Sequence, residues 1–380
     1  MAATTSILPV DTIEFEILPR LPVKSLLRFK SVCKSWNSLI SSDVFIKSVR
    51  NSDHDSVTLV SHSGQDNLYG HFTAVCIGCI NGLVFIEEHQ WDCDSETLEF
   101  IIWNPATKQC LEIRPPPVPI SCRYFLGFGF DSVANDYKFM YVINIKEHPL
   151  VGYIYSCNSG CWTKIIQSNF VVPGCILNMD PVIINGSPFW LILQDLNGSH
   201  LHVMSFDVRQ EFFRLLPDLG SSGPITIEED GECCQLLNFR DSPAVVIYNL
   251  IFCFDETIDI HVFNEKCENW SKMSFKPFKF LSEVPTSCMQ LRFVLGLSNG
   301  DILLVDSEVR KLYWVNLGNY TIKSLREGGD LCYGHKYSES LVFINGMKPL
   351  YQKEDLFQFL SIKKNHGPAR EEIQINRSFK

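Results

Sequence analysis

The run Ile80-Asn81-Gly82-Leu83-Val84-Phe85-Ile86 places an Asn-Gly pair between apolar, β-prone residues. Asn-Gly readily adopts the backbone angles of a tight hairpin turn, so the run predicts two antiparallel strands joined at Asn81-Gly82. The pattern recurs at Ile184-Asn185-Gly186 and Ser298-Asn299-Gly300, each followed by further short β-rich runs. Because no segment after residue 57 keeps a helical period over three turns, we expect an all-β body.

The spacing of these Asn residues indicates a repeat. Asn81 and Asn185 lie 104 positions apart, and Asn185 and Asn299 lie 114 apart. These spacings are about twice the ~50-residue period of kelch-type propeller blades. Units of the same kind fill the two gaps, at 127–165 and 245–273, and both contain Trp-Ser/Thr-Lys after a polar turn. The body is therefore expected to contain at least five blade-like units.

A sixth unit would close the ring. We expect it from pairing of Leu341-Val342-Phe343-Ile344 with Val57-Thr58-Leu59-Val60, because joining both chain ends in one blade protects the sheet edges. The predicted fold class is a small all-α N-terminal module of three short helices followed by a large all-β domain, a six-bladed kelch-like β-propeller. A pair of β-sandwiches is the alternative, since it too consists of many short strands joined by turns.

The first 50 residues, which we call the head, have a helical pattern. Leu8-Pro9 precedes Asp11, which has the spacing of a capping box with Glu14. Further helices are predicted over 23–29 and 31–40 from apolar residues at helical spacing. Three short helices in about 40 residues are near the lower limit for folding alone. We expect the head to complete its core with a partner, or else against the body.

The head resembles the F-box of plant F-box proteins along its whole length, in Leu8-Pro9, Ile17-Leu18, 21–30, 32–36 and 39–40. The resemblance implies docking on a Skp-family adaptor, which bridges to a cullin scaffold and its ubiquitin-conjugating enzyme. Large apolar anchors are the residue types expected in such an interface. The docking residues implied are Leu8, Pro9, Ile17, Leu18, Leu21, Pro22, Val23, Leu26, Phe29, Val32, Cys33 and Trp36.

The body, residues 57–350, resembles the plant F-box-associated domain. Its marks are Cys79-Ile80-Asn81-Gly82-Leu83-Val84, Trp103-Asn104-Pro105-Ala106-Thr107-Lys108, Gly127-Phe128-Gly129-Phe130-Asp131 and Ser205-Phe206-Asp207. The resemblance implies a surface that recognises a protein substrate. Within this family, 337–345 and the acidic body are similar to the S-locus F-box group, whose implied substrates are basic pistil ribonucleases.

The net charge of −10 is unevenly distributed. Residues 1–50 hold seven basic and four acidic side chains (+3), and the other 330 residues hold 26 basic and 39 acidic ones (−13). An acidic body disfavours nucleic acid and favours a basic protein partner. The candidate contacts with such a substrate are Glu228, Glu229, Asp230, Asp255 and Glu256.

No catalytic, cofactor or metal site is predicted. Gly296-x-Ser298-x-Gly300 matches a nucleophile elbow, but a strand is expected after it where the elbow needs a helix. Cys76-x-x-Cys79, Cys157 with Cys161, and His200 with His202 each lack the further ligands that zinc requires. We interpret the fifteen cysteines as reduced, mostly buried thiols.

The longest apolar run, 244–254, is too short to span a bilayer, and the first residues lack a signal-peptide pattern. We therefore expect a cytoplasmic or nuclear protein without membrane contact. The predicted domains are an F-box (1–50), an F-box-associated propeller (57–350) and a partly flexible tail (351–380), with a short helix at 356–360.

The predicted function is substrate recognition in an SCF-type (Skp-cullin-F-box) E3 ubiquitin ligase, without catalysis by this chain and leading to proteasomal degradation of the substrate. The chain would speed ubiquitin transfer by holding substrate lysines close to the conjugating enzyme. Two alternatives remain: a propeller hydrolase or oxidase with a site at the ring centre, and an F-box scaffold that acts outside the ligase.

Overall fold

We analysed a computed structural model of the 380-residue chain. It describes residues 10–49, 56–62, 71–92, 95–118, 124–143, 149–167, 170, 172, 174–176, 181–193, 201–219, 232–249, 251–252, 258–275, 289–296, 300–306, 311–316, 321–325, 335–350, 357–364 and 373–377.

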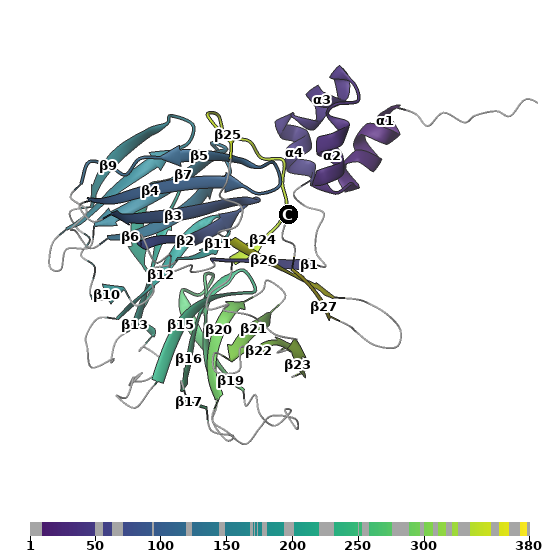
Figure 1. Ribbon diagram of the computed structural model, residues 1–380. Coiled ribbons are helices and arrows are strands. Elements are labelled where there is room, and N and C mark those ends of the chain that lie inside the picture. Colours follow the sequence, from purple (N-terminus) through teal and green to yellow (C-terminus); the bar gives the residue numbers. More distant parts are fainter. Residues whose placement is uncertain are drawn as a thin grey trace, which may run out of the picture.

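The head consists of short helices packed at one corner of the β domain (Figure 1). They are α1 Val10–Thr12 with the π-helical turn η1 Ile13–Ile17 and the 3₁₀ turn η2 Leu18–Arg20, then α2 Val23–Phe29, α3 Lys34–Ile40 and α4 Asp43–Val49.

Two details of the predicted head are wrong. Asp11 lies inside α1, which begins at Val10, so it does not cap the first helix. The sequence also predicted three helices and missed α4, whose first turn is stabilised by a hydrogen bond from the Phe45 backbone N–H to Ser42 Oγ (3.3 Å). The predicted helices ended at Ile40, and the polar run Ser41-Ser42-Asp43 follows it. It is the N-terminal cap of a further helix, which buries Phe45, Ile46 and Val49.

The strands of the body form six antiparallel sheets. Sheet 1 contains β2 His71–Ile80, β3 Leu83–Asp92, β4 Ser95–Asn104, β5 Gln109–Ile113 and β25 Lys348–Pro349. Sheet 2 contains β6 Tyr124–Asp131, β7 Asp136–Ile143, β8 Leu150–Ser156 and β9 Cys161–Gln167. Sheet 3 contains β10 Cys175–Ile176, β11 Val182–Ile184, β12 Ser187–Leu193, β13 Leu201–Asp207 and β14 Phe212–Leu215.

Sheet 4 contains β15 Glu232–Phe239, β16 Ser242–Asn249, β18 Ile258–Asn264 and β19 Asn269–Phe275. Sheet 5 contains β17 Ile251–Phe252, β20 Met289–Gly296, β21 Asp301–Asp306, β22 Lys311–Asn316 and β23 Thr321–Leu325. Sheet 6 contains β24 His335–Tyr337, β1 Ser56–His62, β26 Phe357–Lys364 and β27 Ile373–Arg377. The predicted strands and hairpins therefore have counterparts in the structure.

The core is divided among the interfaces between successive sheets. One apolar cluster joins sheets 1 and 2, and others join sheets 2 and 3, 3 and 4, and 4 and 5. A further cluster joins sheet 6 to sheet 1 through Tyr337 and residues of β2 to β5. Sheets 1 to 4 are thus each covered on both faces by their neighbours, which explains why β7 is buried at every position.

Short turns connect strands at one end of the sheets, which we call the turn end. The inner hairpins of sheets 1, 3 and 4 use two-residue turns in which both residues have positive φ: Asn81-Gly82, Asn185-Gly186 and Arg240-Asp241. This is the geometry of type I′ turns, as predicted from Asn-Gly. Four-residue turns close the outer hairpins of sheets 1 to 4, and the residue before the next strand has positive φ: Lys108, Gly160, Glu211 and Glu268.

The repeated Trp residues link sheets 2 and 4 to the chain that leaves the preceding sheet. Trp162 Nε1 in β9 donates to the carbonyl oxygen of Arg114, just after β5 (2.9 Å). Trp270 Nε1 in β19 donates to the carbonyl oxygen of Pro217, just after β14 (2.7 Å). The Trp-Ser/Thr-Lys repeat seen in the sequence therefore marks equivalent contacts between neighbouring units.

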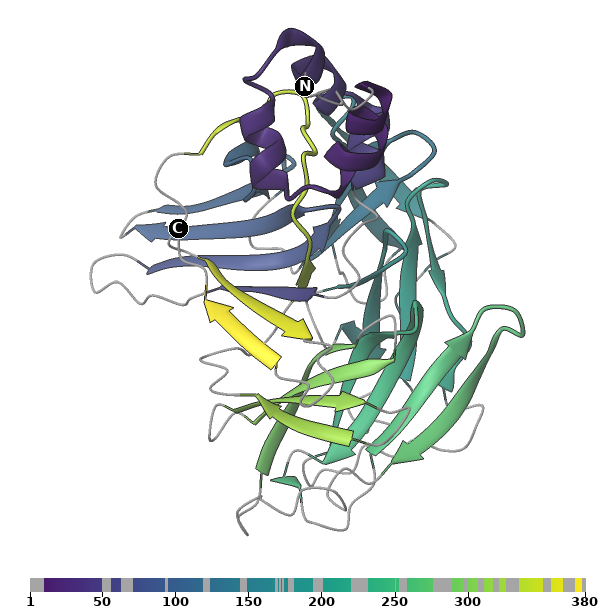
Figure 2. The same cartoon turned by 90° about the vertical axis from the view of Figure 1, so that its right-hand side faces the viewer.

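Sheet 6 contains strands from both ends of the body, as predicted, but with different partners. β1 pairs with β24 and β26, so Leu341–Ile344 is not its partner. In both views sheet 6 lies between sheets 1 and 5 (Figures 1 and 2). The helix predicted at 356–360 is also wrong, because that region contributes β26, which pairs with β1 and β27. The helix was predicted from one apolar patch in a charge-rich segment, whereas backbone pairing with β1 makes the segment a strand.

Candidate functional site

The head exposes large apolar side chains to solvent. Phe15 is 66% exposed, Ile17 38%, Val32 60% and Val44 80%. Among the residues that the structure describes, these are four of the seven large apolar side chains classed as exposed. Because the head is a small part of the chain, this concentration of exposed apolar area indicates a surface that a partner covers.

The docking residues implied by the sequence fall into three groups. Ile17, Pro22, Val32 and Cys33 are exposed, and Leu21, Phe29 and Trp36 are half-buried. Leu18, Val23 and Leu26 are buried inside the chain, where they build the apolar cluster that contains the head. Leu8 and Pro9 lie outside the described residues. A role in docking stays a prediction for all of these residues.

Phe29 and Trp36 hold α2 and α3 together, with their rings edge to face at a centroid distance of 5.5 Å. Cys33 precedes α3, and its Sγ accepts a hydrogen bond from the Trp36 backbone N–H (3.5 Å). The hydrogen bond with the Ser35 side chain and then that with Trp36 lower the pKa of the Cys33 thiol. The half-buried rings of Phe29 and Trp36 and the exposed Cys33 therefore lie together where α2 meets α3.

Sequence reasoning missed Phe15 and Val44 as candidates for the docking surface. Phe15 lies in η1 and is not among the apolar residues of the F-box resemblance, and Val44 belongs to the helix that was not predicted. Their signal in the sequence was an apolar residue off the buried stripe of its own helix, next to acidic or basic neighbours.

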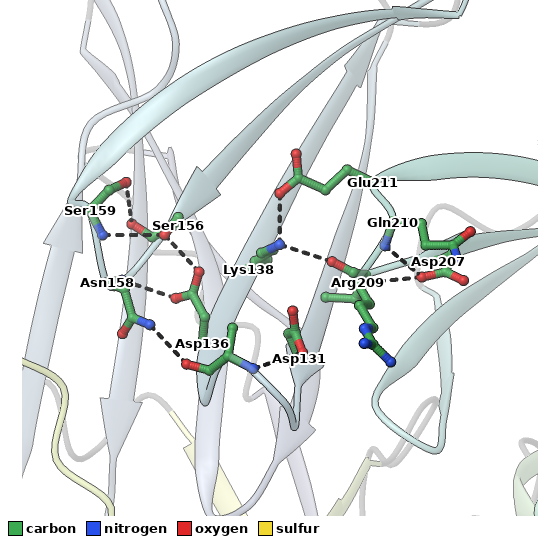
Figure 3. A network of polar contacts seen from close by, with 12 residues as sticks. Asp131, Asp136, Lys138, Ser156, Asn158, Ser159, Asp207, Arg209, Gln210 and Glu211 are labelled. Atoms are coloured by element: carbon green, nitrogen blue, oxygen red, sulfur yellow. Dashed lines mark hydrogen bonds and ion pairs between the residues drawn. The ribbon is translucent and has the colours of Figure 1, made fainter.

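The turn end of sheets 2 and 3 holds a network of polar contacts (Figure 3). Lys138 Nζ donates to Glu211 Oε1 (2.7 Å) and to the Val208 carbonyl oxygen (3.0 Å), joining β7 to the β13–β14 turn. Asp136 accepts hydrogen bonds from Ser156 Oγ (2.6 Å) and from the Asn158 backbone N–H (2.9 Å). These groups are used within the chain, so the network stabilises the fold rather than offering a site.

At the opposite end of the sheets β14 and β19 finish and β15 and β20 begin, and the connections between them include 220–231 and 276–288, which lie outside the described residues. The acidic candidates Glu228, Glu229, Asp230, Asp255 and Glu256 are also outside the described residues, so the structure places none of them. We call this end the loop end.

One described polar cluster points toward the loop end. Glu87 and His89 lie on β3 far from the Asn81-Gly82 turn, and Tyr124 begins β6 in the next sheet. Tyr124 Oη donates to Glu87 Oε1 (2.5 Å), and His89 Nε2 lies 3.0 Å from the same oxygen. The Tyr124 ring stacks on Tyr141 at 4.5 Å. No sequence motif pointed to this cluster, apart from the Glu-x-His spacing that puts Glu87 and His89 on one face of β3.

The candidate metal ligands from the sequence are not brought together. The Sγ atoms of Cys76 and Cys79 are 4.0 Å apart, and burial raises the pKa of the Cys79 thiol well above its usual value. His335 Nε2 lies 3.0 Å from the Cys76 carbonyl oxygen, to which it donates in the neutral tautomer. No group of three or more His, Cys, Asp or Glu side chains in the described part of the chain is arranged to hold a metal ion.

The other chemical candidates are similarly resolved. Cys157 is buried, which raises the pKa of its thiol, whereas Cys161 is exposed at the start of β9. His202 lies on β13, and His200 and Ser298 lie outside the described residues. The strand β21 follows Gly300, as predicted, where a nucleophile elbow needs a helix. Within the described residues, no helix is both long and apolar enough to cross a membrane.

Comparison with known families agrees with this architecture. The model of the F-box associated beta propeller domain matches residues 31–328, and that of the F-box domain matches residues 7–48. The chain therefore belongs to the F-box associated β-propeller family and carries an N-terminal F-box. The match confirms the predicted propeller type over the sandwich alternative, whereas six as the number of blades stays a prediction.

Relatives in Arabidopsis thaliana are named for the F-box, some together with kelch repeats. An F-box protein is 33% identical over 245 residues, which cover 56% of this chain and 62% of that protein. An F-box/kelch-repeat protein is 27% identical over 305 residues, 70% of this chain and 78% of that one. Among solved structures, a fucose-specific lectin from Aleuria aurantia aligns over 82% of this chain and 95% of its own, with 9% identity and a TM-score of 0.40. The lectin's likeness is too low to inform function.

An F-box joined to an F-box-associated propeller is the domain arrangement of a substrate adaptor, in which the F-box binds the Skp-family subunit of an SCF-type ligase. The two domains thus support substrate recognition in an SCF complex as the general role.

Proposed function

We propose that this chain is the substrate receptor of an SCF-type ubiquitin ligase, without catalytic chemistry of its own. The observation that carries this proposal is the exposure of Phe15, Ile17, Val32 and Val44 on the F-box head. A Skp-family adaptor that covers these side chains would remove their apolar area from water, a favourable contribution to binding. Such a complex would work in the cytoplasm or nucleus and lead to degradation of the bound protein.

The substrate would bind at the loop end of the body. The turn end is occupied by short, internally hydrogen-bonded turns, and near sheet 1 by the chain segment on which the head packs. Long connections at the other end can bring side chains from several sheets together around one partner. The chain would then increase the local concentration of substrate lysines at the conjugating enzyme.

A basic protein is the substrate class that the charge distribution supports. The residues after the head carry a net charge of −13, and the described Glu87 carboxylate lies toward the loop end. A basic pistil ribonuclease is the particular member of this class that the resemblance to the S-locus group suggests. Long-range attraction between opposite charges weakens as salt increases.

Two pull-down experiments test these parts separately. The full chain is expected to capture a Skp-family adaptor, and replacement of Phe15 and Val44 by Ser should abolish that capture. For the substrate, the chain with its adaptor is expected to bind basic ribonucleases from pistil extract at low salt and to release them as salt increases. Capture of the adaptor without effect on the half-life of any bound partner would instead favour a scaffold outside the ligase.

A further inference from the structure

One segment of the body crosses the contact with the head. After β24 in sheet 6, residues 338–350, which we call the strap, run past the head to the outer edge of sheet 1 (Figures 1 and 2). There Lys348 and Pro349 pair with β5, and the Leu350 backbone N–H donates to the Lys108 carbonyl oxygen (2.9 Å). The strap therefore joins the last sheet to the first.

Asn104 holds the middle of the strap. Its Nδ2 donates to the carbonyl oxygens of Ser340 (3.1 Å) and Val342 (2.8 Å), more than 230 positions away in the sequence. Its Oδ1 accepts hydrogen bonds from the backbone N–H groups of Ala106 (3.0 Å) and Thr107 (3.3 Å). Asn104 is fully buried, and both the NH2 group and the carbonyl oxygen of its side-chain amide form hydrogen bonds.

Asn104 thus has two roles, as hydrogen-bond acceptor within its own turn and as donor to the strap. The equivalent turns of other sheets show the acceptor role without a strap. Asp207 Oδ1 accepts from the backbone N–H groups of Arg209 and Gln210, and Asn264 Oδ1 accepts from that of Lys266. These acceptors close the outer turns of sheets 3 and 4 just as Asn104 does in sheet 1. An Asp therefore suffices for the turn, whereas an amide donor is needed only where the strap passes.

The strap also packs tightly on the neighbouring turn. Gly82 has φ +77°, and a Cβ atom there would collide with the Ser340 side chain and lie 2.6 Å from the Ser338 carbonyl oxygen. Leu341, Val342, Ile344 and Met347 on the strap are buried in the cluster that contains the head residues Leu18, Val23, Leu26, Ile40, Phe45, Ile46 and Val49. The strap thus supplies apolar surface for the F-box and polar anchors for sheet 1.

We propose that the strap fixes the F-box rigidly on the propeller and that Asn104 is the positioning residue of this contact. This inference rests on the proposed function: a rigid contact would hold the loop end, and the lysines of a bound substrate, in one orientation toward the conjugating enzyme. Only lysines within reach of the conjugating enzyme would then be modified efficiently.

Asn104→Asp is the sharpest variant, because it keeps the turn acceptor and turns a carboxylate oxygen toward two carbonyl groups. Hydrogen exchange of the full chain is the measurement. We expect amides of α4 and the strap to exchange at least tenfold faster in Asn104→Asp than in the wild type. Asn264→Asp, the same change in a turn without a strap, should leave α4 unchanged.

Ile344→Ala provides a second route if Asn104→Asp fails to fold, since it thins the apolar contact and leaves the turn intact. Ile258→Ala, in the cluster between sheets 4 and 5, is its matched control. Faster exchange in α4 is expected for Ile344→Ala alone. Wild-type exchange in α4 for the folded strap variants, or equal acceleration by Ile258→Ala, would overturn the proposal.

The consequence for the ligase is tested on the complete reconstituted complex, with ubiquitin transfer to lysines of the chain itself as readout. Asn104→Asp should bind the adaptor within twofold of wild type, yet modify a wider set of lysines, several-fold more slowly. An unchanged set of sites would contradict a positioning role. If the wild-type chain failed to bind the adaptor, the proposed function would fail, whereas hydrogen exchange would still decide on the strap.

Discussion

The head and the body solve the problem of burying apolar side chains in different ways. In the body, sheets 1 to 4 are each covered on both faces by their neighbours, and Phe85, Phe100 and Phe139 are fully buried. In the head, Phe15 and Val44 remain exposed although Leu18 and Leu26 are buried. The apolar side chains of sheets 1 to 4 are thus buried within the chain itself, whereas the head keeps large apolar side chains that are available to a partner.

The largest expected effect comes from one substitution made in both regions. Phe139 is fully buried, 4.2 Å from the Phe85 ring centroid, so Phe139→Ala should lower the free energy of unfolding by about 3–5 kcal/mol. Phe15→Ala should change it by less than about 0.5 kcal/mol. Urea denaturation followed by tryptophan fluorescence measures both. Comparable losses in the two variants would break the comparison between head and body.

Acid should weaken the contact between sheets 6 and 1. Burial lowers the pKa of His335 to about 4 from a usual value of 6.5. The unfolded chain therefore binds a proton between these values while the folded chain does not, so stability is full above about pH 6.5 and declines toward pH 4.

Because His335 as a whole residue is half-buried, we expect a loss of about 1–2 kcal/mol, less than the shift alone would give. His335→Gln removes the titrating group and should reduce the decline between pH 6.5 and pH 4. An equally steep decline in His335→Gln would assign the acid sensitivity to other groups.

A smaller effect is expected from the polar network at the turn end. Lys138→Met removes the hydrogen bonds to Glu211 and to the Val208 carbonyl oxygen and should lower the free energy of unfolding by about 1 kcal/mol. Adaptor binding should not change, because sheets 2 and 3 contain none of the exposed head residues. Calorimetric unfolding and a binding titration check the two halves of this prediction. Weaker adaptor binding in a folded Lys138→Met would show that the regions are coupled there.

The smallest effect is a gain. Glu268 has φ +48° in the four-residue turn of sheet 4, where sheet 2 has Gly160 with φ +67°. Glu268→Gly removes the steric cost of a side chain at a left-handed backbone position and should raise the free energy of unfolding by about 0.5 kcal/mol. The greater freedom of Gly in the unfolded chain offsets part of the gain. Thermal unfolding measures it, with Lys266→Gly in the same turn as the control expected to destabilise. A loss of stability in Glu268→Gly would mean that the Glu268 side chain contributes contacts.

Much of the body was predictable because its turns are local. The Asn-Gly pairs at 81–82 and 185–186 determine a tight turn with positive φ at both residues. The repeated Trp162 and Trp270 mark equivalent strands. The strap was not predictable, since apolar Leu341–Ile344 suits a strand as well as a buried connection. What decides it is the pair of Asn104 hydrogen bonds, formed across more than 230 positions in the sequence. The exposed head residues were only partly predictable, because exposure depends on how four short helices pack.

Whether the exposed head residues contact the adaptor is decided by the binding affinity of the full chain for a Skp-family adaptor, measured by calorimetry for two matched variants. Val44 on the head is 80% exposed, and Val133 on the body is 69% exposed. Val44→Asp should weaken adaptor binding at least tenfold, because the charge would be buried in the interface, whereas Val133→Asp should leave the affinity within twofold of wild type. Equal weakening by both variants, or wild-type affinity of Val44→Asp, would contradict the assignment of this face to the adaptor.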